Sequence, residues 1–276
     1  SQTFGKSDYR ELVNIILRNF FIAFIIAFLI IISEPILINI IFQIFTVSTE
    51  TNSFIKDYIS IRVFSAPAEL TIYVLVGFFL GIQRTIISSS LIIMLSILNI
   101  CFSIYFVNEL GLNVKGVAFG TLLSAYITFL SFSVYTYFYF IKRFKVIPRF
   151  AYKKLLNFKK IFKLLIINFN IFIRTVLLTF SFFWITYLGS TLGEEYVAVN
   201  AVLLQLIFIS SFFLDAYAFS TEGIIGYSIG KKSFKMFSST VKNSLILSFI
   251  TGVLISIFFL FLAKEIIDLI TDLEFL

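Results

Sequence analysis

Two carboxylates, Asp215 and Glu222, stand inside a long apolar run from Val197 to Ile225. Ionised carboxylates are costly in hydrocarbon, so on membrane helices they usually face a bundle interior or a water-filled cavity and often mark ion pathways. Because a helix turns once every 3.6 residues, their separation of seven residues brings both side chains to nearly the same face. We therefore predict that this pair takes part in membrane transport.

The composition supports a membrane protein, because 59% of the 276 residues are hydrophobic and only 13% are charged, against about 25% charged in soluble proteins. Histidine is absent, which excludes imidazole metal sites and His-based catalysis, and we expect no metal or cofactor. The single Cys101 lies in an apolar run and is expected to be a small buried hydrophobe.

Seven windows are long and apolar enough to cross the hydrocarbon as helices, which takes about 20 residues. They lie near residues 13–33, 61–82, 86–108, 115–141, 166–189, 196–224 and 238–263. A closed barrel of short alternating strands does not fit runs of this length. We predict an all-α, polytopic membrane helix bundle, with a kink or break of the first helix at Pro35.

The basic residues set the predicted orientation, because Lys and Arg accumulate in cytoplasmic loops. With Ser1 in the cytoplasm, most of them fall inside, above all the cluster from Lys142 to Lys163. The segments placed outside instead carry acidic residues: Glu50, Asp57, Glu109, Glu194, Glu195, Asp268 and Asp272. The net charge of +7 is thus read as a topology signal, no nucleic-acid partner is expected, and Leu276 lies outside.

An internal repeat relates residues 1–50 to residues 226–275 without gaps, for example Gly5-Lys6 to Gly230-Lys231. Transporters built from two similar helical halves give such a pattern. We predict one lobe over 1–141, a second over 166–276, and a basic cytoplasmic linker at 142–165. The linker fits either an interfacial helix at the inner leaflet or a solvated connector.

Other polar residues in the apolar runs have structural explanations when spacing alone is considered. Arg62 and Glu69 are also seven residues apart, which favours a structural ion pair or snorkelling near the outer boundary. Four residues on the third and fourth spans favour interhelical hydrogen bonding: Asn99, Ser103, Thr121 and Ser124.

A common resemblance runs through residues 62–70, 73–85, 98–100, 114–121 and 197–230. These stretches are similar to the multidrug and toxic compound extrusion (MATE) transporters of the DinF-like branch. Residues 62–70 and 73–85 resemble the fourth helix and its turn, and residues 98–100 and 114–121 resemble the fifth helix and the start of the sixth. The most specific stretch, residues 197–230, contains Asn200 and Gln205 followed by Asp215 and Glu222, and it is similar to the eighth helix. On this resemblance, the sequence runs from just after the second to just after the ninth of twelve helices.

The resemblance implies a two-lobe antiporter of the inner (plasma) membrane that alternates between inward-facing and outward-facing states. It would export amphiphilic, mostly cationic small molecules in exchange for H+ or Na+, and be monomeric when full length. In the family's amino-terminal cation site, Asn99 and Thr121 match an Asn and a Thr, but Ser103 stands where an Asp is expected. The family's first helix is also absent from the sequence. Either that missing helix supplies the charge alone, or Asp215 and Glu222 carry more of the coupling. The predicted cation- and substrate-binding residues are Asn99, Thr121, Asn200, Gln205, Asp215 and Glu222.

Three alternatives remain open. A flippase for lipid-linked precursors has a similar two-lobe plan but should show a basic intramembrane cavity. A membrane-embedded acyl or glycosyl transferase needs a catalytic cluster at a membrane face, which the predicted loops do not offer, so no enzyme activity is expected. A truncated fragment would lack function by itself, because part of each lobe's cavity wall is missing.

Overall fold

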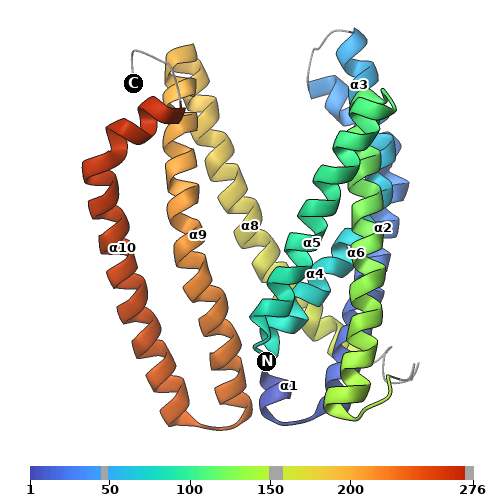
Figure 1. Ribbon diagram of the computed structural model, residues 1–276, viewed down its shortest axis with the longest axis vertical. Helices are drawn as coiled ribbons and strands as arrows, with labels where there is room; N and C mark the ends of the chain where they lie inside the picture. The colour runs from blue at the N-terminus through green and yellow to red at the C-terminus, as the bar shows by residue number, and fades with distance from the viewer. Residues whose placement is uncertain (45–48, 149–157, 271–276) are drawn as a thin grey trace. The chain divides into compact units, whose positions relative to one another are not determined.

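The computed structural model describes residues 1–44, 49–148 and 158–270, and its chain divides into two compact units, Ser1–Leu156 and Asn157–Leu276. All regular elements of the described residues are helical (Figure 1). Unit 1 contains, in order, α1 (Gln2–Gly5), α2 (Tyr9–Ile44), α3 (Thr49–Arg62), the 3-10 helix η1 (Val63–Ser65), α4 (Ala66–Gly81), α5 (Thr85–Ile104), the π-helix η2 (Tyr105–Glu109) and α6 (Asn113–Phe144). Unit 2 contains α8 (Phe158–Leu192), α9 (Glu194–Gly230) and α10 (Phe234–Ile270).

Seven helical stretches of the described chain are long and apolar enough to span a membrane, which confirms the seven predicted spans. They are Tyr9–Ile40, Asn52–Gly81, Thr85–Glu109, Asn113–Phe144, Leu164–Thr191, Val199–Gly230 and Phe234–Leu262. The second consists of α3, η1 and α4 in succession. The all-α membrane bundle is therefore confirmed.

Three local predictions change. Cys101, which was expected to be buried, is exposed. No break occurs at Pro35, because α2 runs through it as far as Ile44. Proline there lacks an N–H for the carbonyl of Ile31, yet a long apolar helix tolerates one lost bond. The last part of the predicted basic linker is also not a separate element, because α8 begins at Phe158 and carries Lys159 and Lys160 in its first turn.

Helix α4 forms the centre of unit 1, packed against α2, α5 and α6. One core cluster joins α2, α4 and α6 and includes Phe78 and Phe140, whose rings stack with centroids 5.4 Å apart. The second joins α4, α5 and α6 through Ile72, Leu91 and Ala125. These contacts fix α4 relative to α5 and α6, the helices that carry the site described below.

Small residues on α6 let α5 and η2 approach its backbone closely. A Cβ atom added at Gly116 would lie 2.9 Å from the carbonyl carbon of Phe106, and one added at Gly120 would lie 2.6 Å from Ser103 Oγ and 2.7 Å from Ser103 N. Gly116, Gly120 and Ser124 repeat at intervals of four residues and are all buried. This is the small-residue packing by which membrane helices associate without a hydrophobic drive.

The turn between α1 and α2 repeats in the turn between α9 and α10. The amides of Lys6, Ser7 and Asp8 bond to the carbonyls of Gln2, Phe4 and Thr3, and those of Lys231, Lys232 and Ser233 bond to Tyr227, Ile229 and Ser228. Each partner lies 225 residues further along the chain, so the repeat inferred from the sequence is confirmed at this turn. Both are Schellman-type helix ends.

A left-handed residue closes each of these turns, and a third turn, between α4 and α5, has the same bonds at Ile82, Gln83 and Arg84. The left-handed residues are Ser7, Gln83 and Lys232, with φ of 58°, 62° and 56°. None is glycine, although this conformation strains any residue with a Cβ atom.

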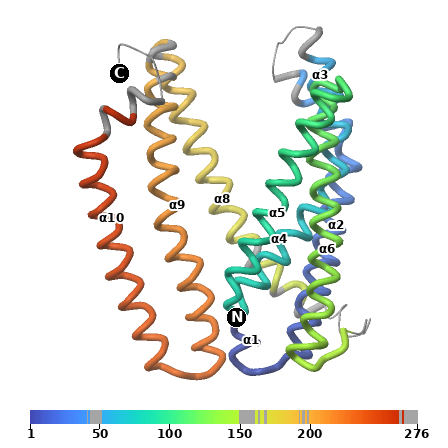
Figure 2. Tube along the Cα trace, in the orientation of Figure 1, coloured from blue at the N-terminus to red at the C-terminus, as the bar shows by residue number. Residues whose placement is uncertain are grey.

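In unit 2, α9 packs against both α8 and α10. Figure 2 shows α9 and α10 side by side and running in opposite directions, joined by the short turn between Gly230 and Phe234. Two side-chain bonds link them: the hydroxyls of Tyr217 and Thr251, 2.8 Å apart, and those of Thr221 and Ser244.

Replacing the left-handed residues by glycine should stabilise the protein. Ser7→Gly and Gln83→Gly each remove strain worth about 1 kcal/mol and should raise the unfolding temperature in detergent. Ser90→Gly is the matched control, because Ser90 lies within α5. Glycine in a helix interior should lower the unfolding temperature. Equal effects at the three positions would contradict the strain argument.

Gly120→Ala should destabilise unit 1, because the added methyl group meets the backbone of Ser103 and must push α5 and α6 apart, at about 1–3 kcal/mol. Gly77→Ala on α4 is the control, since a Cβ there has nothing within 4 Å. It should be neutral or slightly stabilising, because alanine favours the helix. Unfolding temperatures of the purified variants in detergent check both expectations, and an undiminished value for Gly120→Ala would refute the close crossing.

Candidate functional site

Unit 1 contains an open cavity of about 410 Å³ that is lined by both polar and aliphatic side chains. Its polar lining comes from four elements: Arg62 at the end of α3, Glu69 and Tyr73 on α4, Ser96 and Asn99 on α5, and Thr121 on α6. The remaining lining is aliphatic: Ile72, Ile92, Leu95 and Ile100. Residues distant in the sequence therefore meet at one apolar-walled space inside a membrane bundle.

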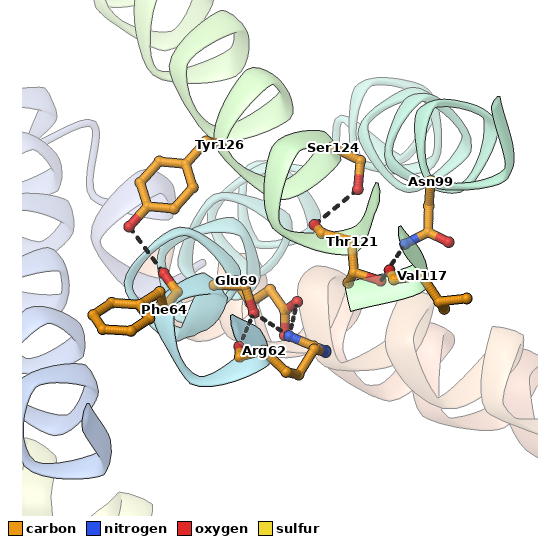
Figure 3. A network of polar contacts seen from close by, with 9 residues as sticks. Arg62, Phe64, Glu69, Asn99, Val117, Thr121, Ser124 and Tyr126 are labelled. Atoms are coloured by element: carbon orange, nitrogen blue, oxygen red, sulfur yellow. Dashed lines mark hydrogen bonds and ion pairs between the residues drawn. The ribbon is translucent and has the colours of Figure 1, made fainter. Parts of the chain in front are cut away.

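Asn99 and Thr121, the two predicted residues of the amino-terminal cation site, are in direct contact. Asn99 Nδ2 donates a hydrogen bond to Thr121 Oγ1 over 2.9 Å, and Thr121 Oγ1 donates to the carbonyl of Val117 over 3.0 Å. Because the threonine hydrogen is committed to Val117, Thr121 can only accept from Asn99, and this sets the orientation of the amide. Figure 3 shows Asn99 Oδ1 pointing away from Thr121, which leaves it free to accept from a ligand.

Ser103 follows Asn99 by one helical turn but does not line this cavity. Its hydroxyl packs against Gly120, is buried, and has no hydrogen-bond partner within the described part of the chain. A larger side chain at this point would have to turn away or separate α5 from α6. The close crossing gives a physical reason for a serine here.

Arg62 and Glu69 form a two-point ion pair at the cavity wall. The distance from Nη1 to Oε1 is 2.5 Å and that from Nη2 to Oε2 is 2.9 Å, and Nη1 also donates to Ser65 Oγ. The predicted ion pair is confirmed. It lines the same cavity as Asn99 and Thr121, which its spacing alone did not indicate; all four residues are labelled in Figure 3. The proline between the charges was the available signal, since it marks a helix break in an apolar run.

The break between α3 and α4 positions this pair. Pro67 lies in the first turn of α4, where a missing N–H costs least, and the preceding residues form the 3-10 helix η1. The hydroxyl of Tyr126 on α6 donates to the carbonyl of Phe64 over 3.0 Å. The break is thereby held against α6, so that Arg62 and Glu69 are placed on the same cavity as Thr121.

The four predicted residues of unit 2 all lie on α9 but do not form a closed site. Asn200 packs against α8 at Gly189, where an added Cβ would come within 2.6 Å of Asn200 Nδ2. Gln205, Asp215 and Glu222 are exposed, and within the described residues no hydrogen bond or ion pair is found for them.

Asp215 and Glu222 lie away from the α10 side of their helix. Asp215 precedes Tyr217, which bonds to α10, by two residues, a rotation of about 200°. The unit's own cavity of about 470 Å³, between α9 and α10, is almost entirely apolar and is not lined by either carboxylate. Their predicted shared face is consistent with the helix, and their role stays a prediction.

The described residues hold no cluster of three or more His, Cys, Asp or Glu side chains that suits a metal ion. The groups brought together in unit 1 are a carboxylate, a guanidinium, an amide and hydroxyls. Such a set can bind a charged or hydrogen-bonding organic molecule or a hard monovalent cation.

Comparison with known proteins identifies the family. Residues 1–105 and 171–274 match the family MatE. DNA damage-inducible protein F of Escherichia coli (strain K12) is 30% identical over 231 residues, which cover 79% of this chain and 47% of that protein. The chain thus spans about half the length of this curated relative.

Solved structures show the same fold at low identity. A MATE transporter in the straight conformation aligns with a TM-score of 0.85 and 18% identity, over 98% of this chain and 60% of the other. An outward-facing multidrug resistance MATE family transporter of the MOP superfamily gives 0.85 and 19%, over 98% and 59%. A MOP superfamily transporter from Pyrococcus furiosus gives 0.85 and 18%, over 99% and 60%. The chain therefore belongs to the MatE family of multi-pass membrane transporters, in the branch of DNA damage-inducible protein F that residues 62–85 and 197–230 predict.

Proposed function

We propose that the protein exports amphiphilic organic cations in exchange for H+ or Na+, by alternating access between two lobes that include residues 1–141 and 166–276. The observation that carries the proposal is the Asn99–Thr121 bond at the wall of a 410 Å³ apolar cavity that also holds a carboxylate, Glu69. Family membership supports the general class of function, which is secondary transport. The residues that line the cavity support the chemical class of the substrate.

The cavity suits an amphiphilic cation on physical grounds. Its aliphatic walls accept an apolar body, and transfer of that body from water is worth about 25 cal/mol per Å². Asn99 Oδ1 and Glu69 offer oxygen acceptors to a positive head group, and Tyr73 offers an aromatic face. A buried cation without such partners would be strongly disfavoured.

The carboxylates on α9 are the proposed second coupling element. Protonation or Na+ binding removes the net charge of Asp215 or Glu222. Without that charge, their helix can pack against apolar surroundings that the ionised carboxylate would disfavour. Asn200 and Gln205 are proposed as polar contacts for substrate on the same helix. We further propose a monomer in the inner (plasma) membrane, with Ser1 in the cytoplasm and Leu276 outside.

The flippase alternative requires a basic cavity. A solved transporter of similar fold, from Pyrococcus furiosus, is described as having a binding pocket of reversed polarity that suggests a different function. In the present chain, the guanidinium of Arg62 is neutralised by Glu69, so the cavity of unit 1 has no net positive charge among its lining residues. This balance favours cation export.

Thr121→Val and Asn99→Leu should lower export of a fluorescent organic cation by about tenfold or more, which corresponds to about 1.4 kcal/mol of lost interaction. Each removes a partner of the bond that orients Asn99 Oδ1. The measurement is efflux from cells that express the complete gene, driven in separate experiments by a pH gradient and by a Na+ gradient. The gradient that drives efflux identifies the coupling ion.

Thr136→Val is the matched control for Thr121→Val. Thr136 lies on the same helix and bonds only to its own helix, at the carbonyl of Phe132, and it does not line the cavity. Export should persist in this variant. Equal export by both valine variants would remove the support for the site.

The double variant Asp215→Asn, Glu222→Gln should reduce gradient-driven export while leaving the expression level unchanged, because both amides keep the shape of the carboxylates without their charge. The single variants show whether one carboxylate suffices. Full export by the double variant would exclude a coupling role for the pair.

A further inference from the structure

We propose that Glu69 is the carboxylate that binds the transported cation in the cavity of unit 1, and that Arg62 is a tethered competitor whose guanidinium this cation displaces. The inference rests on the proposed function, cation export, and deepens it by naming the binding group and what occupies it at rest. It assigns the Arg62–Glu69 pair a role in selectivity beyond holding α3 to α4.

The first step is that one carboxylate lines this cavity among the residues that the structure describes. Glu69 is the acidic residue among the lining side chains, with Arg62 the basic one. Ser103, at the turn after Asn99, lies outside the cavity against Gly120. Among the described residues that line this cavity, Glu69 is therefore the source of full negative charge for a cation that enters.

The second step is that Glu69 already holds a cation. Both of its oxygens bond to Arg62, at 2.5 and 2.9 Å, the two-point geometry that makes arginine–carboxylate pairs strong and directional. An isolated carboxylate on a membrane-spanning helix would be costly, and the guanidinium keeps the empty cavity neutral. Because the pair is neutral as a whole, a substrate cation gains the full charge of Glu69 only by replacing Arg62.

The third step is that the exchange is feasible. The side chains of Arg62 and Glu69 are 32% and 21% exposed, so the pair is open to the cavity. Arg62 keeps a contact at its own end of the break, because Nη1 also donates to Ser65 Oγ and Ser65 Oγ donates to the carbonyl of Arg62. Replacing one ion pair by another costs little net free energy, and transport requires binding weak enough to release.

A second ion pair in unit 1 provides the contrast. Lys115 on α6 lies 3.3 Å from Asp57 on α3, with side chains 49% and 35% exposed. It joins α3 to α6, whereas the Arg62–Glu69 pair joins α3 to α4, and it does not line the cavity. A purely structural ion pair should behave like this one when it is removed.

The test is binding of tetraphenylphosphonium, a lipophilic organic cation, to the purified full-length protein, measured by isothermal titration calorimetry. Arg62→Gln should lower the Kd about tenfold, because it frees a carboxylate worth on the order of 1.4 kcal/mol to the ligand. Lys115→Gln, which removes the same charge outside the cavity, should leave the Kd unchanged. Arg62→Lys keeps the charge but loses the two-point geometry, so it should lower the Kd by a smaller factor. This variant replaces Arg62→Gln in the test if Arg62→Gln does not fold.

Glu69→Gln should weaken tetraphenylphosphonium binding by about tenfold. The double variant Arg62→Gln, Glu69→Gln should bind as weakly as Glu69→Gln, because the gain from removing Arg62 exists only while Glu69 is ionised. This non-additivity is the signature of competition for one group. Additive effects, or a Kd in Arg62→Gln that matches Lys115→Gln, would reduce the pair to a structural role.

The outcomes separate this proposal from the proposed function. One outcome is tighter binding by Arg62→Gln together with export that is unchanged in Asn99→Leu and Thr121→Val. This outcome supports the competition and overturns the proposed transport site. Export that depends on Asn99 and Thr121, together with an unchanged Kd in Arg62→Gln, overturns the competition alone. No binding by wild type or by Arg62→Gln also overturns it.

Discussion

The close crossing of α5 and α6 is the constraint on which the site of unit 1 depends. Gly116 and Gly120 bring the backbone of α6 against η2 and Ser103, and only at this separation does Asn99 reach Thr121 over 2.9 Å. Within a membrane, such approach is stabilised by van der Waals packing and interhelical hydrogen bonds, because apolar burial gains nothing against lipid. Because the helices are so close, position 103 has space for a side chain about the size of serine and not for a larger one.

Backbone hydrogen bonding is the second organising requirement. In hydrocarbon each unpaired backbone group is costly, so the break between α3 and α4 needs partners from elsewhere, and Tyr126 supplies one to Phe64. The break in turn sets Arg62 and Glu69 on the cavity. The charged pair of the site therefore lies where a 3-10 turn interrupts the α-helical hydrogen bonding of this span, and transporter sites commonly form at irregular helix segments.

Charge balance links the site to transport. A cavity that holds an ionised carboxylate without a counter-ion would be unstable when empty, whereas one with a permanent fixed pair would bind nothing further. A tethered guanidinium in a partly open cavity lies between these extremes. In unit 2, the carboxylates on α9 lie opposite the face that contacts α10. Their role in transport depends on which groups of the full-length protein lie next to them.

The fold class, the seven spans, the turn repeated at an offset of 225 residues and the family could all be predicted from the amino-acid sequence. Apolar length, turn chemistry and local motifs are properties of consecutive residues. The sequence also singled out Asn99 and Thr121, and it paired Arg62 with Glu69. Only the tertiary structure decided that these four residues share one cavity, that Ser103 does not, and that α2 continues through Pro35. The reason is that the separation and rotation of packed helices depend on contacts between distant segments, such as Gly120 against Ser103, which no local pattern encodes.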